Sequence, residues 1–142
     1  MARVVRSSRP MAWQLRAVVG GWILAGLLIC SASAEAQQLG GPWQGRWQSR
    51  STGHRGPLAA TFQATGPNTY QANFRGRFAG IIPFRYSVPL TVVQSGPVEV
   101  LSGQSRLPLF GTFRYTAVSD GRTFTANYSS RRDQGVFLLA RP

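Results

Sequence analysis

The residue types that perform acid-base, nucleophilic or metal chemistry are sparse in this chain. Its 142 residues contain one histidine, His54, and one cysteine, Cys30, and beyond residue 36 the acids are Glu99, Asp120 and Asp133. No cysteine, histidine or carboxylate stands at a spacing typical of a metal site. The acids are too few for a carboxylate pair or a Ser-His-Asp arrangement. We therefore expect no enzyme activity, no metal and no cofactor, and interpret His54 as a solvated loop residue.

The first 36 residues have the layout of a secretory signal peptide. An arginine-rich start, from Met1 or Met11, precedes a continuous apolar run over residues 17–30, and small residues around Ala34 and Ala36 offer cleavage sites. The run is shorter than the roughly 20 residues of a spanning helix. Cys30 leaves a lipoprotein alternative open. We expect cleavage after Ala34 or Ala36, a secreted or periplasmic domain over residues 37–142, and no membrane span in the mature chain.

Arginine is the abundant charged side chain. The formal net charge is +12, and all 16 basic residues are arginine because the chain has no lysine. A basic surface favours anionic partners. No nucleic-acid-binding motif is visible, and secretion would remove the protein from most nucleic acid. The expected partners are therefore an anionic or amphipathic small molecule, a polysaccharide or a lipid headgroup, and not nucleic acid.

The mature region has the pattern of a series of short β-strands. Apolar and polar side chains alternate within runs bounded by Gly, Pro, Asn, Asp and Ser, which is typical of half-buried strands. The expected strands cover residues 42–50, 58–65, 69–78, 83–94, 97–105, 111–118, 123–129 and 135–141. The sequence therefore predicts an all-β fold, a single antiparallel up-and-down meander of about eight strands that closes into a small barrel.

The alternation assigns an inner and an outer face to each strand. Aromatic and aliphatic side chains share one parity and most arginines share the other, with Arg85 opposite either Arg75 or Arg77 across a hairpin. An outer-membrane barrel is the alternative, with aromatics toward lipid and arginines in the lumen. Those arginines would need buried counter-charges, yet Glu99 is the one acid within a strand. We therefore favour an apolar interior and arginines outside.

Two local details can also be predicted. In strand 97–105 the parity of Val98 and Val100 leads to polar residues, so Gly103 is expected to mark a bulge that changes the phase. Asp120-Gly121 is a strong two-residue turn signal, and a turn centred there pairs Ala117 with Phe124.

Gly41-Pro42-Trp43 opens the first expected strand. A Gly-x-Trp in this position, followed by consecutive antiparallel strands in a secreted chain, resembles the calycins: the lipocalins and their smaller avidin-like and fatty-acid-binding relatives. The resemblance implies that Trp43 plugs the closed end of the barrel and that an arginine late in the chain, here Arg141, packs over it. The chain is shorter than a typical lipocalin. The alternative is that Trp43 and Trp47 are simply core residues.

Alternate connections of an up-and-down barrel lie at the same end. One end therefore receives three tight turns, and the other receives the loops near residues 52–57, 79–82, 106–110 and 129–134. These loops combine apolar residues with arginines, and loops on a rigid scaffold commonly carry binding sites. We predict a site for an amphipathic or anionic ligand or partner, formed by Arg55, Ile81, Ile82, Arg106, Leu107, Leu109, Phe110, Arg131 and Arg132.

Two alternatives to this site remain open. The apolar loop residues could fold inward and cap the barrel while the arginines merely solvate its rim. The interior of a small barrel is the second open question, because it has room either for side chains alone or for one small ligand. The competing function is therefore a structural or interaction module with a filled barrel and no small-molecule ligand.

Overall fold

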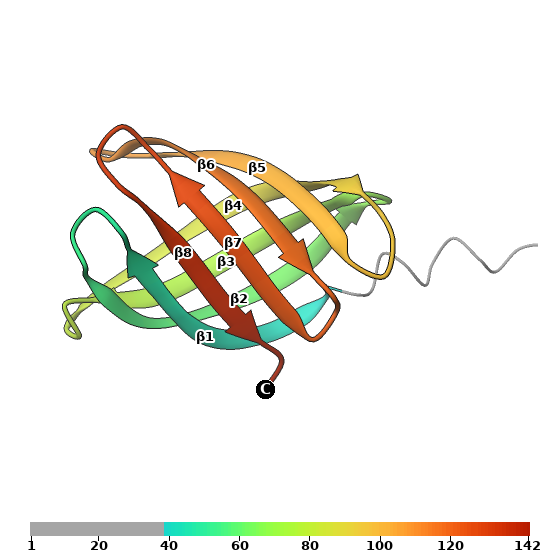
Figure 1. The fold of residues 1–142 in the computed structure, drawn as a ribbon, viewed down its shortest axis with the longest axis horizontal. Helices are drawn as coiled ribbons and strands as arrows, with labels where there is room; N and C mark the ends of the chain where they lie inside the picture. The colour runs from blue at the N-terminus through green and yellow to red at the C-terminus, as the bar shows by residue number, and fades with distance from the viewer. Residues whose placement is uncertain (1–38) are drawn as a thin grey trace, which may run out of the picture.

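A computed structural model describes residues 39–142, which form a closed barrel of eight antiparallel strands (Figure 1). Each strand pairs with the next, and β1 pairs with β8 to close the sheet. The strands are β1 (Gly41–Ser49), β2 (Arg55–Gly66), β3 (Thr69–Phe78), β4 (Ile82–Gln94), β5 (Glu99–Leu107), β6 (Gly111–Ser119), β7 (Thr123–Ser129) and β8 (Gln134–Ala140). The predicted fold class is confirmed.

The described region begins after the proposed leader. The expected signal peptide, its cleavage site and Cys30 therefore lie outside the described residues. From residue 39 onward, the chain contains no helix with the length and apolarity needed to span a bilayer.

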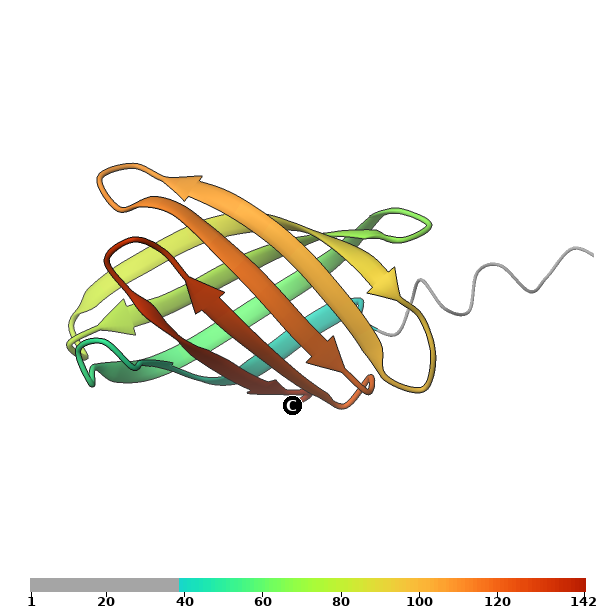
Figure 2. The same cartoon turned by 45° about the horizontal axis from the view of Figure 1, so that its top comes forward.

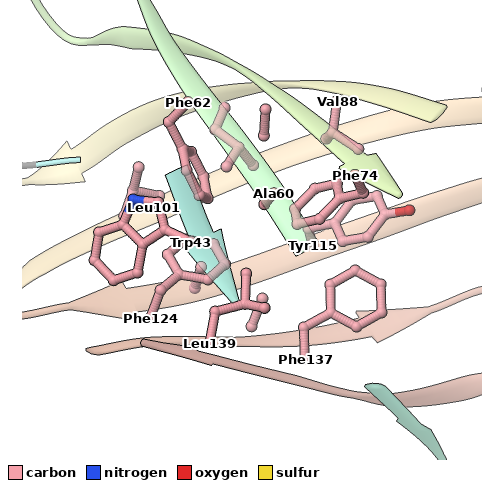
Figure 3. Packing of buried hydrophobic residues seen from close by; sticks show 14 of the residues in the cluster. Trp43, Ala60, Phe62, Phe74, Val88, Leu101, Tyr115, Phe124, Phe137 and Leu139 are labelled. Carbon is pink, nitrogen blue, oxygen red and sulfur yellow. The ribbon is translucent and has the colours of Figure 1, made fainter. Parts of the chain in front are cut away.

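Most side chains that face the barrel interior are apolar, and the arginines of the strands are exposed on its outside, as predicted. Trp43, Phe62 and Phe124 pack against one another with ring centroids 4.9–6.3 Å apart (Figure 3). On the outer face, Arg85 lies directly opposite Arg75, which was one of the two expected pairings. The period-2 pattern therefore placed both faces correctly in β1–β4, β6 and β7.

Inward-facing glycines allow the strands to approach closely where the sheet curves. A Cβ atom added to Gly45 would collide with the carbonyl of Leu138 on β8, and one added to Gly135 would collide with the carbonyl of Gln48 on β1. Both glycines lie in the ladder that closes the barrel. A larger residue at either position would push β1 and β8 apart.

The predicted register of the β6–β7 hairpin was wrong by two residues. Phe124 pairs with Ser119 instead of Ala117, so the inward faces are unchanged. Gly121, with φ of 82°, and Arg122 occupy the centre of the turn. Asp120 instead accepts hydrogen bonds at Oδ1 from the backbone N–H groups of Arg122 (2.9 Å) and Thr123 (2.6 Å). The Asp side chain thus caps the turn from its first position, a role that Asp favours.

The predicted phase change at Gly103 was also wrong. Strand β5 keeps one parity along its whole ladder with β6, so Glu99 and Leu101 are buried while Val98 is exposed. Gly103 serves a different purpose, because a Cβ there would meet the carbonyl of Pro89 on β4. The irregularity lies between Val92 and Gln94 of β4 instead.

Trp43 closes one end of the barrel. Its Nε1–H donates to the carbonyl of Leu39 (2.8 Å), which is itself fully buried. The guanidinium carbon of Arg141 lies 4.7 Å from the centroid of the Trp43 ring. Arg141 also donates from Nε to Gly121 O (2.7 Å) and from Nη1 to Gly40 O (3.0 Å). The arginine-over-tryptophan contact expected from the resemblance is therefore present, and we call this the closed end.

We expect Arg141→Ala to lower the free energy of unfolding by about 1–2 kcal/mol, because it removes the cation–π contact and two hydrogen bonds at the closed end. Denaturant unfolding measures the change. Arg46→Ala is the matched control, because Arg46 is an exposed β1 arginine on the outer face, and we expect a change within about 0.5 kcal/mol. Equal losses in the two variants would contradict the assigned role of Arg141.

Candidate functional site

The four other connections lie together at the end opposite Trp43, as predicted (Figures 1 and 2). We call this the loop end. Ile81, Ile82, Leu109 and Phe110 are exposed there, and Leu107 is half-buried. The idea that the apolar loop residues fold inward as a cap is therefore wrong for the four exposed side chains. Their role in binding stays a prediction.

An outer groove of about 680 Å³ lies at the loop end, beside the β5–β6 hairpin. The hairpin projects past its neighbour: the β6–β7 ladder ends at Arg114–Ser129, whereas the β5–β6 ladder continues to Leu107–Gly111. The groove follows from this overhang. We call it the arginine groove; it is lined by Arg106, Leu109, Phe110, Gly111, Thr112, Arg114, Ser129, Ser130, Arg131 and Arg132.

The arginine groove has a strongly positive lining. Four arginines contribute to it, and none of the acids among residues 39–142 does. Asp133 follows Arg132 in the chain but turns toward the barrel interior. Its Oδ1 accepts a hydrogen bond from Ser49 Oγ (2.6 Å) and its Oδ2 accepts one from Tyr128 (3.1 Å). Because both oxygens are used inside, this carboxylate ties the β7–β8 loop to β1 without occupying the groove.

The structure brings part of the predicted site together. The predicted residues that line the groove are Arg106, Leu109, Phe110, Arg131 and Arg132. The predicted residues that do not line it are Arg55, Ile81, Ile82 and Leu107. Sequence reasoning missed five lining residues: Gly111, Thr112, Arg114, Ser129 and Ser130. The alternation placed Arg114 on the outer face, but it did not show how far the hairpin overhangs β7.

A second groove of the same volume lies on the outer face of β1–β4. It contains Arg75, Arg77 and Arg85, together with Pro57 and Pro83 and other residues of those strands. The large exposed side chains of the hairpin tips are not part of it. This groove therefore offers arginines without an apolar tip, which makes it a useful comparison.

The barrel wall is least paired between β4 and β5. Their ladder runs from Leu90–Gly103 to Gln94–Val100, so the loop-end halves of both strands lie beyond it. Further toward the loop end, Ser105 Oγ donates to the carbonyl of Ser87 (3.0 Å). We call this region the β4–β5 seam. Among the rings that face inward in the same half of the barrel, those of Phe84, Tyr86 and Phe113 are half-buried.

Tyrosine hydroxyls give the same half of the barrel a polar interior. Tyr115 is buried, and its hydroxyl points away from Trp43 (Figure 3). Tyr86 lies beside this hydroxyl, but the hydroxyl makes no hydrogen bond with any described residue. Burial raises the pKa of Tyr115 to about 12 and the pKa of Tyr86 well above its usual value. Burial, and then the charge of Asp133, also raises the pKa of Tyr128 above its usual value.

Comparisons with known proteins give a fold and no family. No protein-family model matches the chain, and no curated protein matches it. Among solved structures, the chain resembles a de novo designed fluorescence-activating β-barrel (19% identity, TM-score 0.55, covering 75% of this chain and 96% of that one). It also resembles a redesigned β-barrel, mFAP1, bound to DFHBI (22% identity, TM-score 0.61, covering 77% and 100%). The chain is thus an eight-stranded antiparallel barrel with the fold of these designed proteins.

We expect Tyr115→Phe to leave the free energy of unfolding unchanged or to raise it by up to about 1 kcal/mol, because it removes a buried hydroxyl that lacks a hydrogen bond. Tyr128→Phe is the control. It removes the hydrogen bond to Asp133 and should destabilise the fold by about 1–3 kcal/mol. Denaturant unfolding compares the two, and a larger loss for Tyr115→Phe would contradict the described hydroxyl environment.

The tyrosines also predict an alkaline limit to stability. The chain has four tyrosines, and the native fold raises the pKa of each. In the unfolded chain, the tyrosine hydroxyls ionise at about pH 10. Stability from this source is therefore complete below that pH and falls as the pH rises through the higher native pKa values. Ultraviolet absorbance should show tyrosinate in the folded protein at higher pH than in denaturant, and coincident titrations would contradict this prediction.

Proposed function

We propose that the chain is a small-molecule-binding barrel that binds an amphipathic anion in the arginine groove. One observation carries this proposal: four arginines and the exposed side chains of Leu109 and Phe110 line the same groove. Guanidinium groups bind carboxylate, sulfate or phosphate through paired hydrogen bonds. The apolar part of the ligand would lie against Leu109 and Phe110. A volume of about 680 Å³ suits a small molecule.

The fold supports a binding function without specifying the ligand. Two similar solved structures are barrels bound to DFHBI, so this architecture can carry a small-molecule site. The contact between Arg141 and Trp43 supports the calycin-type resemblance. We further propose that the barrel binds without catalysing a reaction and acts after export, in the periplasm or outside the cell, because its leader has the pattern of a signal peptide.

The competing proposal is a filled barrel that acts as a structural or interaction module. The packing of Trp43, Phe62, Phe124 and Leu101 in the closed half favours it, because these buried side chains occupy the interior there. The loop-end half differs, since Phe84, Tyr86 and Phe113 remain half-buried. A measurement of small-molecule binding separates the two proposals.

Octyl sulfate below its micellar concentration is a suitable probe, because it combines an anionic group with a short apolar chain. We expect saturable binding by isothermal titration calorimetry, weakened at high salt. The double variant Arg114→Gln and Arg131→Gln should weaken the Kd by about tenfold or more, because each substitution removes a charged hydrogen-bond donor from the groove.

The control for this titration has the same change of charge at the other groove. Arg75→Gln combined with Arg85→Gln should leave the Kd within about twofold, apart from a small effect of net charge. Equal weakening in both double variants would show a general charge effect and contradict a specific site. Absence of saturable binding to the unaltered chain would favour the filled interaction module.

A further inference from the structure

We propose that the loop end docks on the surface of an anionic lipid bilayer, with the tips of the β3–β4 and β5–β6 hairpins inserted among the headgroups. Four large apolar side chains carry the contact. Ile81 is 79% exposed and Ile82 55% on one tip, and Leu109 is 91% exposed and Phe110 62% on the other. Both tips lie at the same end of the barrel (Figures 1 and 2), so a single flat surface can meet both.

The two tips share a closing hydrogen bond, although their backbones differ: Ala79 and Gly80 both have positive φ at one tip, whereas Leu109 alone has it between Leu107 and Phe110. In each, an N–H closes a turn onto a carbonyl three residues earlier, Ile81 onto Phe78 (3.2 Å) and Phe110 onto Leu107 (3.2 Å). In each, the residue that closes the turn is apolar and exposed. The β3–β4 and β5–β6 hairpins therefore both present a large exposed apolar side chain at the loop end.

Leu109 occupies a position that neither backbone preference nor folding explains. Its φ is 69°, in the left-handed region, and Pro108 precedes it as in a turn that favours glycine at this place. An exposed leucine there adds backbone strain and gains almost no burial within the barrel. Burial of the Leu109 side chain in an apolar partner would offset this backbone strain.

The charge at the loop end identifies the partner. Arg106, Arg131 and Arg132 surround the β5–β6 tip, and Arg77 precedes the β3–β4 tip. Of the acids among residues 39–142, Glu99 and Asp120 lie toward the closed end, and Asp133 faces the interior. Basic side chains beside inserted apolar ones are the combination that binds an anionic lipid surface.

Other occupants fit these observations less well. A second copy of this chain would bring the same arginines to the contact, so the two loop ends would repel. An anionic polysaccharide would use the arginines but would leave Ile81 and Leu109 in water. A fluid bilayer accommodates separate protruding tips, and its headgroups supply the opposite charge.

This inference rests on the proposed function at one point, because the arginine groove would then hold the headgroup of an anionic lipid. The β3–β4 tip is independent of it, since Ile81 and Ile82 do not line the groove. Substitutions at that tip therefore test docking without altering the site for a soluble anion.

The test is sedimentation of residues 37–142, the form expected after cleavage, with vesicles of phosphatidylglycerol and phosphatidylcholine in equal parts, compared with vesicles of phosphatidylcholine alone. We expect the unaltered chain to bind the anionic vesicles more tightly. Ile81→Ser combined with Ile82→Ser should weaken binding to anionic vesicles by about tenfold, because two apolar side chains no longer insert. The same variant should bind octyl sulfate with an unchanged Kd.

The matched control removes similar apolar surface from the rest of the barrel. Val93 and Val98 are also exposed but lie toward the closed end, so Val93→Ser with Val98→Ser should leave vesicle binding within about twofold. Thermal unfolding verifies that each variant is folded.

Three results would overturn the docking proposal. The first is equal vesicle binding by the Ile81/Ile82 and Val93/Val98 variants. The second is equal binding of the unaltered chain to anionic and neutral vesicles. The third is vesicle binding that depends on Arg131 and Arg132 while being indifferent to both tips, which would mean adsorption by charge alone, as on a polysaccharide. Loss of octyl sulfate binding with intact, tip-dependent vesicle binding would instead reject only the groove as the proposed small-molecule site.

Discussion

Closure of the sheet by the β1–β8 ladder is the constraint on which the rest of the structure depends. It joins the first and last strands, so neither β1 nor β8 is a free edge strand, and it requires Gly45 and Gly135 where the two backbones approach. Closure also brings both Leu39 and Arg141 into contact with Trp43. The segments that flank the barrel strands thus complete the closed end.

The difference between the two ends explains why function is proposed at one of them. The closed end has short turns, a buried tryptophan and an arginine that is engaged by carbonyls and a ring. At the loop end, the β5–β6 ladder extends further than the β6–β7 ladder, so the β5–β6 hairpin projects beyond β7. The same overhang creates the arginine groove and carries Leu109 and Phe110 away from the barrel wall. Asp133 contributes indirectly, because its hydrogen bonds to Ser49 and Tyr128 hold the loop that bears Arg131 and Arg132.

Strand number, facing and the grouping of loops could be predicted from the sequence, because alternation and turn residues are local signals. Register was harder. Asp120-Gly121 marks a turn, but the choice between two registers depends on how the Asp side chain caps it, and both choices keep the same faces inward. Contacts distant in sequence were not predictable: nothing local shows that Asp133 accepts from Ser49, or that Arg114 joins Arg131 in one groove. The inward position of Glu99 was missed because the two valines on either side of it suggested the opposite parity.

Because the ladder between β4 and β5 is short, the barrel wall resists opening less there than between the other strands. The β3–β4 ladder holds from Thr69–Thr91 to Phe78–Ile82, whereas the β4–β5 ladder stops at Leu90–Gly103. Separation of the wall along the seam breaks few backbone hydrogen bonds and leaves the β1–β8 closure intact. The side of the barrel beside the half-buried rings of Phe84 and Tyr86 therefore has the least backbone pairing to resist local opening. Opening along the β4–β5 seam would admit solvent to the half of the interior that the tyrosines line, while the packing around Trp43 at the closed end would stay intact.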